Sequence, residues 1–400
     1  MQSRFQTIDT FLVTHQSLWR FEAFLRCFEG VSLWQQQFPQ LHHWLESLSI
    51  EEIERLKNDT DELINQLSNL IPELSLIPQL TRLPFTQHSV LERNLTLEAG
   101  IPGRKLSQIK ALGQSVLKQH HGHEWLEWCA GKGYLGRILA FNSKQPVVSF
   151  EYQQALCESG QSEAEHLDLP MTFVQGDAFE SESAQVFHSD QHAVALHACG
   201  DLHVRLMHNA AVAKTKAVSF SPCCYHLTHH DTYQAQSSLG KNSELRLTKQ
   251  ELRIPLQETV TGGERVKRHR QQEMSFRLGL DALLREELGF SEYMPVPSIK
   301  KSMLSEGFEA FCIWAAEQKG ILLPKLNFAH YEKIGIQYFW QMERLSLVQQ
   351  SFRRLLEIWL VLDKAMFLWE KGYQVELSEF CNREDTPRNI LIHAVRNESF

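Results

Sequence analysis

Short apolar runs recur between residues 125 and 221, and segments with helical patterns separate them. The runs are the stretch around Trp125 and Leu126 and residues 147–150, 171–174, 192–198 and 216–221. Apolar runs of this length, bounded by turn signals, are typical of buried strands. Strand and helix patterns that alternate in this way predict a parallel sheet with helices on its faces, which is an α/β fold.

The first 95 residues or so carry apolar side chains at helical spacing. One series is Phe21, Phe24, Leu25 and Phe28, and another is Ile53, Leu56, Leu63, Leu67 and Leu70. This pattern predicts an N-terminal helical region over residues 1–95. Residues 101–107 interrupt it, and a helix over 107–119 then leads into the first strand. We therefore expect the domain that contains the sheet to span residues 96–400.

The alternation ends after the fifth run. A polar stretch followed by helical patterns, such as residues 274–288, predicts a mainly helical insertion at about 227–345. A long helical pattern then ends at Lys371 and Gly372, and residues 373–380 and 389–395 resemble two paired strands that complete a mostly parallel, seven-stranded sheet. Residues 292–296 and 308–315 are a competing choice for this pair.

Glycines follow the first predicted strand directly. Gly131, Gly133 and Gly136 fit the dinucleotide pattern G-x-G-x-x-G, and an acidic residue, Glu127, with a small residue before the first glycine fits the S-adenosylmethionine variant. Glycines let a backbone approach a ligand closely, and the following helix offers unpaired N–H groups. Either cofactor class is compatible with the glycines alone.

Acidic residues at the ends of the next two strands favour one class. Glu151 ends the second run, about 20 residues after the glycines, where a carboxylate binds ribose hydroxyls. Asp177 and Ala178 follow the third run, where a methyltransferase binds the adenine amino group. With Glu127, three strand-end acids favour S-adenosylmethionine, although solvated strand ends around a tight turn would give the same pattern.

Composition narrows the class of protein. The formal net charge of −8 argues against a surface coated in positive charge for nonspecific nucleic-acid binding. Eight cysteines, with Cys223 and Cys224 adjacent, do not form the framework of a secreted disulfide domain. We see no signal-peptide pattern and no apolar run of about 20 residues, so we expect a cytoplasmic protein without a membrane partner.

Reactive side chains follow the fourth and fifth runs. Asp201 offers a carboxylate for chemistry, or caps the next helix. Residues 220–226 end in two thiols, Tyr225 and His226. Tyr225 is suited to stack on a base, and His226 is suited to act as a base near neutral pH. Cys223 and Cys224 are alternatively small buried hydrophobes.

Two further groups of residues bear on a metal site and on a basic surface. Cys223, Cys224, His226, His229 and His230 form one cluster, but it lacks paired C-x-x-C spacing, so no metal site is predicted. Basic residues gather at Arg104 and Lys105, at residues 265–270, and at Lys300 and Lys301. They form either a phosphate-binding face or solvated surface.

Several of these segments together resemble the methyltransferase-like protein 25 family, which is distantly related to the eukaryotic acceptor-stem tRNA ribose methyltransferases. They are Arg104-Lys105, residues 129–135, residues 196–202, Cys223-Cys224-Tyr225-His226 and Thr386-Pro387-Arg388-Asn389. The resemblance implies a Rossmann-like S-adenosylmethionine-dependent methyltransferase. Cys129 stands where most such enzymes have glycine, and His226 where many relatives have asparagine.

The expected site follows from the residues and the resemblance together. The cofactor-binding residues are Glu127, Cys129, Gly131, Gly133, Glu151, Asp177, Ala178 and His197. The catalytic residues are Asp201, Tyr225 and His226, and the substrate-binding residues are Arg104, Lys105, Pro222, Cys223 and Cys224.

We expect methyl transfer to RNA, either tRNA or rRNA. Alternatives are a protein substrate, an NAD(P)-dependent oxidoreductase, and a noncatalytic RNA- or protein-binding adaptor. Nothing in the sequence indicates an oligomeric state.

Overall fold

The chain forms two compact units. The computed structural model describes residues 1–86, 88, 91, 95–257 and 263–397. Unit 1 contains Met1–Thr14, Leu80–Val260 and Arg353–Phe400, and unit 2 contains His15–Gln79 and Thr261–Phe352. The sequence predicts domain boundaries near residues 95, 227 and 345. A division into compact units does not test whether these segments are independent domains, so the boundaries remain predictions.

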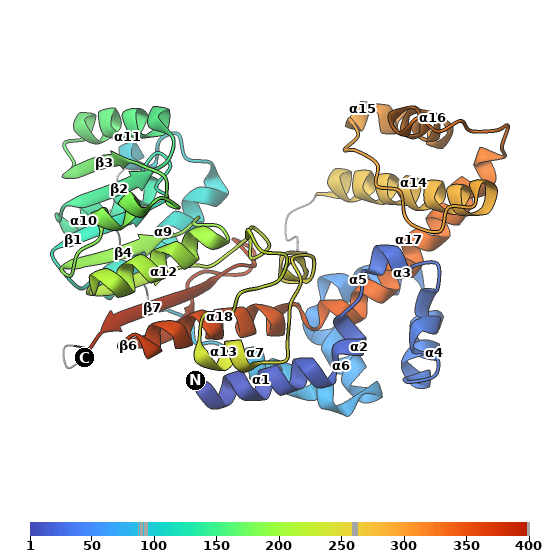
Figure 1. The fold of residues 1–400 in the computed structure, drawn as a ribbon, viewed down its shortest axis with the longest axis horizontal. Helices are drawn as coiled ribbons and strands as arrows, with labels where there is room; N and C mark the ends of the chain where they lie inside the picture. The colour runs from blue at the N-terminus through green and yellow to red at the C-terminus, as the bar shows by residue number, and fades with distance from the viewer. Residues whose placement is uncertain (87, 89–90, 92–94, 258–262, 398–400) are drawn as a thin grey trace. The chain divides into compact units, whose positions relative to one another are not determined.

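Unit 1 is built on a seven-stranded sheet with the order β3-β2-β1-β4-β5-β7-β6 (Figure 1). Its strands are β1 Glu124–Trp128, β2 Val147–Glu151, β3 Met171–Gln175, β4 Gln191–Ala195, β5 Ala217–Phe220, β6 Tyr373–Glu379 and β7 Ile390–Arg396. Strands β1 to β5 pair in parallel, and β7 is antiparallel to both β5 and β6. The predicted α/β fold with a mostly parallel seven-stranded sheet is confirmed.

The terminal strand pair is also confirmed, and the competing pair is wrong. Residues 308–315 lie in a helix, α16 Phe308–Lys319. Phe308, Phe311, Cys312 and Ala315 are its buried residues together with Ala316. These residues are three or four positions apart, so they lie on one face of a helix. In a strand, residues at this spacing would point to both sides.

Helices cover both faces of the sheet. The chain joins β1 to β2 through α10 Tyr134–Ser143 and β2 to β3 through α11 Gln154–His166, whereas α12 Asp201–Ala213 joins β4 to β5. Right-handed crossovers on opposite sides of the first strand place α10 and α12 on opposite faces. Helix α9 Gly103–Lys118 packs on α10, and α18 Arg353–Glu370 packs beside α12 and against β6 (Figure 1).

The apolar core between the sheet and α9 and α10 follows the predicted runs. Trp125, Val147 and Met171 come from the strands, and Leu112, Leu135 and Leu139 come from the helices. The remaining elements of unit 1 are α1 Gln2–Thr14, α8 Leu95–Glu98, η3 Ser181–Val186, α13 Ser238–Asn242 and η4 Glu251–Leu256. Helix α1 packs against α18, so the first 14 residues join the sheet-containing unit.

An ionic cluster ties α18 to the last two strands. Arg354 donates to Glu357 Oε2 at 2.6 Å and to Asn389 Oδ1 at 2.9 Å, and it also pairs with Glu379 of β6. Asn389 in turn donates to the carbonyl of Cys381 at 2.8 Å. Asn389 of the Thr-Pro-Arg-Asn segment therefore has a structural role at the beginning of β7.

Unit 2 is helical among its described residues. Its elements are α2 Gln16–Trp19, α3 Ala23–Arg26, η1 Gly30–Trp34, α4 Pro39–Ser47, α5 Ile50–Asn58, α6 Thr60–Leu70, η2 Pro72–Leu76, α14 Glu264–Leu288, α15 Lys301–Leu304, α16 Phe308–Lys319 and α17 Phe328–Gln350, and α7 Ile77–Thr81 runs from unit 2 into unit 1. Helices α14 and α17 approach closely, because a Cβ at Gly335 would lie 2.1 Å from the carbonyl oxygen of Ser275.

Helix α14 begins at Glu264, earlier than the pattern over 274–288 predicts. Its first turns read Glu-Arg-Val-Lys-Arg-His-Arg-Gln-Gln-Glu, and such a polar segment gives no apolar periodicity. Across residues 1–86, 88, 91, 95–257 and 263–397, we find no helix with the length and apolar character needed to cross a membrane.

Candidate functional site

The parallel strands of unit 1 end on one edge of the sheet, which gathers most of the predicted site residues. Cys129 follows β1, Glu151 ends β2, and Asp177 follows β3. Cys199 and Asp201 follow β4, and Cys223 follows β5. Ligands of open α/β sheets bind beyond these carboxyl ends, so this edge is the candidate site.

The glycines of the first turn have different roles. Gly131 has φ +59°, and among the described residues nothing lies within 4 Å of a Cβ built there. Gly133 also has positive φ, at +70°, but its Cβ would lie 2.5 Å from the ring of Phe173. Gly136 packs helix α10 onto β1, because its Cβ would lie 2.5 Å from Glu127 Oε2. Of these three glycines, Gly131 is the one that offers open space to a ligand.

Glu151 lies directly beside this open position. The Gly131 N–H donates to Glu151 Oε2 at 2.8 Å, and the Gln153 N–H donates to Oε1 at 3.0 Å. The side chain is held by the backbone of the two loops that follow β1 and β2. A carboxylate in this place can accept hydrogen bonds from the hydroxyls of a ribose.

Glu127 is buried beneath the turn. Ser149 Oγ donates to its Oε2 at 2.9 Å, and the backbone N–H groups of Leu135 and Gly136 also hydrogen-bond to the carboxylate. Burial raises the pKa of Glu127 to about 7, although these hydrogen bonds and Arg137 oppose the shift. Glu127 therefore holds the first turn of α10, and its contact with a cofactor remains a prediction.

The third acid, Asp177, lies at the beginning of the loop after β3. Asp177 Oδ1 accepts from the Phe179 N–H at 2.8 Å, which tightens the turn after Gln175. Ala178 is buried, and its carbonyl accepts from Arg205 of α12 at 3.3 Å. These contacts place Asp177 at the same edge as Glu151.

Cys129 stands where most S-adenosylmethionine-dependent methyltransferases have glycine, and its backbone conformation is one that glycine adopts easily. Its φ of 58° lies in the left-handed region, which glycine adopts without strain and cysteine adopts at some cost. Burial, and then the charge of Glu151, raise the pKa of the Cys129 thiol to about 12. The thiol therefore stays protonated near neutral pH and acts as a small side chain.

The loops after β4 and β5 are paired. The Gly200 N–H donates to the Cys223 carbonyl at 3.1 Å, and the Asp201 N–H donates to the Leu227 carbonyl at 3.0 Å. Asp201 Oδ2 also accepts from the His229 N–H at 2.9 Å. Asp201 is the first residue of α12 and not its cap, which is Gly200, so the capping role considered for it is wrong.

Three thiols meet between these loops. The sulfur atoms of Cys199, Cys223 and Cys224 lie within 4.8 Å of one another, and those of Cys199 and Cys223 are 3.4 Å apart. Hydrogen bonds from Cys199 and Cys223 lower the pKa of Cys224. Cys199 belongs to the segment 196–202 singled out in the sequence, but the sequence did not group it with these thiols, because it lies 24 residues before Cys223.

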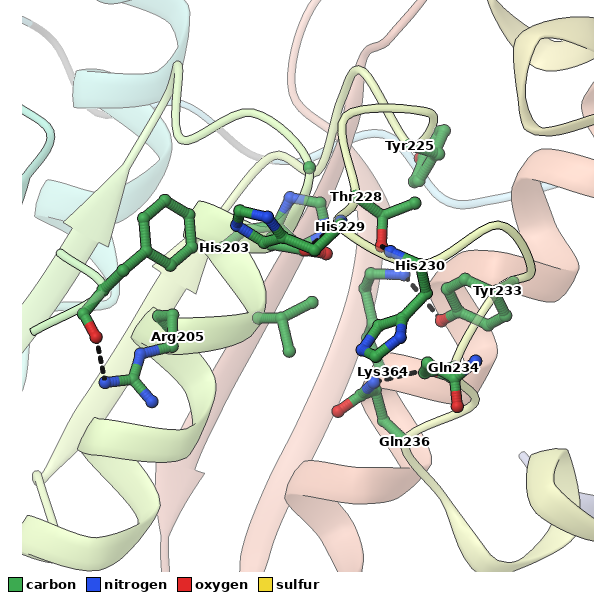
Figure 2. A pocket seen from close by; sticks show the side chains of 14 residues that line it. His203, Arg205, Tyr225, Thr228, His229, His230, Tyr233, Gln234, Gln236 and Lys364 are labelled. Atoms are coloured by element: carbon green, nitrogen blue, oxygen red, sulfur yellow. Dashed lines mark hydrogen bonds between the residues drawn. The ribbon is translucent and has the colours of Figure 1, made fainter. Parts of the chain in front are cut away.

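A cavity of about 230 Å³ adjoins the loops (Figure 2). Figure 2 shows side chains from α12 and from residues 225–236 around Lys364 of α18. Lys364 is fully buried and donates to Tyr233 Oη at 2.9 Å, and burial lowers its pKa to about 8. This lysine is a buried positive charge that the sequence did not single out.

Tyr225 and His226 lie next to each other but in different surroundings. Tyr225 is 3% exposed, its Oη donates to the Pro222 carbonyl at 3.2 Å, and the Lys364 ammonium lies 5.3 Å from its ring centroid. The ring is packed inside the protein. Its stacking on a base is a separate expectation, which remains a prediction. His226 Nδ1 is buried and lacks a hydrogen-bond partner within the described part of the chain.

Basic residues flank the same edge. The Lys105 ammonium lies 5.5 Å from the ring centroid of Tyr134, the residue after Gly133. Desolvation, and then the charge of Lys105, lower the pKa of His197. Arg104 donates to the carbonyl of Asp385 at 3.3 Å. Arg388 interacts electrostatically with Cys224 and Tyr225, and its place in the Thr-Pro-Arg-Asn segment was the available signal.

The other basic clusters lie in unit 2. Lys267 pairs with Glu264 at 2.9 Å, and Arg270 pairs with the buried Glu343 at 3.0 Å. The side chain of Lys301 lies outside the part of the chain that the structure describes. Whether these residues form a phosphate-binding face remains a prediction.

Comparison with known proteins identifies part of unit 1. Residues 104–231, less than half of the chain, match the family model described as a methyltransferase domain. The match contains the glycine turn and the loops after β2 to β5. This part of the chain is a methyltransferase domain. None of the curated proteins compared with the chain matches it.

Two solved structures show weaker likeness. The tRNA (uracil-54, C5)-methyltransferase of Pyrococcus abyssi, in complex with S-adenosyl-L-homocysteine, is 20% identical over 29% of this chain and 28% of its own, with a TM-score of 0.25. An O-methyltransferase family protein of Burkholderia thailandensis is 10% identical over 88% of this chain and 75% of its own, with a TM-score of 0.32. TM-scores this low carry no argument about this chain, which spans less than a third of the Pyrococcus protein.

Proposed function

We propose that the whole chain is an S-adenosylmethionine-dependent methyltransferase that acts on RNA, either tRNA or rRNA. The observation that carries the cofactor assignment is the open position at Gly131 with the Glu151 carboxylate hydrogen-bonded beside it. The antiparallel strand β7 between β5 and β6 also favours a methyltransferase over an NAD(P)-dependent oxidoreductase, whose dinucleotide sheet has the order 3-2-1-4-5-6.

Different residues at the carboxyl edge of the sheet bind different parts of the cofactor. S-adenosylmethionine, when bound, supplies a methyl group on a positively charged sulfur. Gly131 gives its backbone room, Glu151 accepts hydrogen bonds from the ribose, and Asp177 accepts one from the adenine amino group. His197 and Cys129 lie on the same edge and complete the cofactor surface. Direct contact by Glu127 and Gly133 is less favoured, because both are packed under the turn.

Methyl transfer is an in-line displacement, which needs the donor and the acceptor to be aligned. The loops after β4 and β5 are the elements that position the acceptor. Asp201 ties these loops together and orients the acceptor, with His226 as the neighbouring base. Pro222, Cys223 and Cys224 form the wall of the acceptor site.

An RNA acceptor is supported by chemistry at the mouth of the site and by the family resemblance. Lys105 lies beside the residue that follows Gly133, and Arg388 lies near Cys224. Two positive charges at this edge suit phosphate groups on either side of the methylated nucleotide. The resemblance to the methyltransferase-like protein 25 family and to tRNA ribose methyltransferases points to the same class of acceptor.

The cofactor assignment is tested by calorimetric titration with S-adenosylmethionine, S-adenosylhomocysteine and NAD. We expect saturable binding of the two sulfur compounds and none of NAD. Gly131→Arg fills the open position and should lower the affinity more than 100-fold. Gly320→Arg is the matched control, because Gly320 also has positive φ and open surroundings but lies in unit 2. Equal affinity in both variants would refute the assignment.

The acceptor is identified by transfer of a labelled methyl group to cellular RNA and protein fractions. We expect label that ribonuclease releases and that protease leaves in place. Label in protein would replace RNA with a protein substrate. Cofactor binding without transfer to either fraction would favour a noncatalytic adaptor.

A further inference from the structure

The thiols of Cys199, Cys223 and Cys224 have the spacing of metal ligands. Their sulfur atoms lie within 4.8 Å of one another, and those of Cys199 and Cys223 are 3.4 Å apart. In a tetrahedral zinc site with Zn–S bonds of about 2.3 Å, the sulfurs lie about 3.8 Å from each other. This value lies between the 3.4 Å that separates Cys199 from Cys223 and the 4.8 Å limit for all three sulfurs.

The backbone holds the three cysteines together. Cys199 and Cys223 pair as a parallel bridge beyond the ends of β4 and β5, and the Gly200 N–H bonds to the Cys223 carbonyl at 3.1 Å. In an extended strand, neighbouring residues point to opposite sides. Cys224 has φ 48°, which turns the chain and brings its thiol to the same side as that of Cys223.

We propose that Cys199, Cys223 and Cys224 bind one zinc ion. Each thiol loses its proton to solvent when it binds the ion, so three thiolates and a divalent cation leave one net negative charge. The Arg388 guanidinium interacts with Cys224 and offsets that charge. Three protein ligands leave the fourth tetrahedral position to water or to an acceptor atom.

The site differs from the cluster of Cys223, Cys224 and histidines, for which the sequence predicts no metal. The histidines at 226, 229 and 230 are not part of it, and the third ligand comes from the loop after β4. All three cysteines are partly exposed, so an ion can reach them from solvent. The proposal does not depend on the acceptor being RNA.

Metal content and cobalt spectroscopy test this proposal on the full chain. We expect about one zinc per chain after purification in reductant without chelator. Metal-free protein titrated with Co²⁺ should show intense thiolate-to-cobalt bands that saturate at one equivalent and disappear when Zn²⁺ is added. This measurement needs no variant, so it is independent of any folding defect.

Variants then assign the ligands. Cys199→Ser and Cys224→Ser should each weaken Co²⁺ binding more than about tenfold, since losing even an outer-sphere partner costs that much. Cys312→Ala, a buried cysteine of unit 2, should bind as the wild type does. His43→Ala tests the other group with ligand spacing, which is His42, His43 and Glu46 on α4.

Four results would overturn the proposal. These are no thiolate bands in the reduced wild type, bands that Cys199→Ser leaves unchanged, metal lost in His43→Ala alone, and a Cys199–Cys223 disulfide whose reduced form takes up no metal. The last result would make the pair a redox element.

Discussion

At the residue scale, Gly200 is the most constrained glycine of the candidate site. A Cβ there would lie 1.9 Å from the Leu227 carbonyl oxygen, on a backbone with φ +57°. Gly200→Ala should therefore cost about 1–3 kcal/mol of backbone strain, because φ +57° with ψ −125° is rarely adopted by residues other than glycine, and in addition about 1–3 kcal/mol for displacing the loop. Urea denaturation measures the loss.

Gly131→Ala is the matched control for this prediction. Gly131 has nearly the same φ, at +59°, but open space around its Cβ position within the described part of the chain. It should lose only the strain energy. Equal losses in the two variants would show that the contact with Leu227 does not constrain Gly200.

At the scale of elements, Arg354 joins α18 to β6 and β7. Glu357 is 3% exposed, and burial raises its pKa although Arg354 opposes the shift. Arg354→Ala would leave this buried carboxyl group without its ion-pair partner and should cost about 3–5 kcal/mol of unfolding free energy. The double variant Arg354→Met/Glu357→Leu should recover most of that loss in urea denaturation, and a double variant as unstable as the single one would contradict this account.

At the scale of the whole molecule, buried histidines make stability depend on pH. Burial lowers the pKa of His192 well below its usual value, that of His203 to about 3 and that of His393 to about 4. Below pH about 6.5 the unfolded chain binds protons that these folded histidines do not, so stability falls as the pH falls. Above that pH they contribute no slope.

Glu127 acts in the opposite direction. Its pKa is raised to about 7, so the folded state binds a proton that the unfolded state releases above pH about 4.5, and this offsets one histidine as the pH falls from 7. The net expectation is a loss of a few kcal/mol between pH 6.5 and 4.5. Thermal unfolding across this range measures it, and His393→Gln should flatten the curve. A melting temperature independent of pH would contradict the prediction.

The local sequence pattern by itself determined most of the elements of the sheet-containing unit. Five parallel strands, the helices between them, the glycine turn and the terminal strand pair all follow from apolar spacing and turn residues, because each is specified by neighbours along the chain. The strand-end acids could be placed at one edge for the same reason, since parallel strands end together.

Tertiary structure decided what depends on residues far apart in sequence. Packing against Phe173 closes the space beside Gly133 and leaves that beside Gly131 open, a difference that the sequence does not show. The pairing of the loops after β4 and β5 brings Cys199 to Cys223 and Cys224. The buried charge of Lys364 and the placement of Met1–Thr14 in unit 1 likewise come from long-range contacts. The physical reason is that a side chain's space and electrostatic surroundings are set by whichever elements pack against it, and apolar periodicity contains no information about those partners.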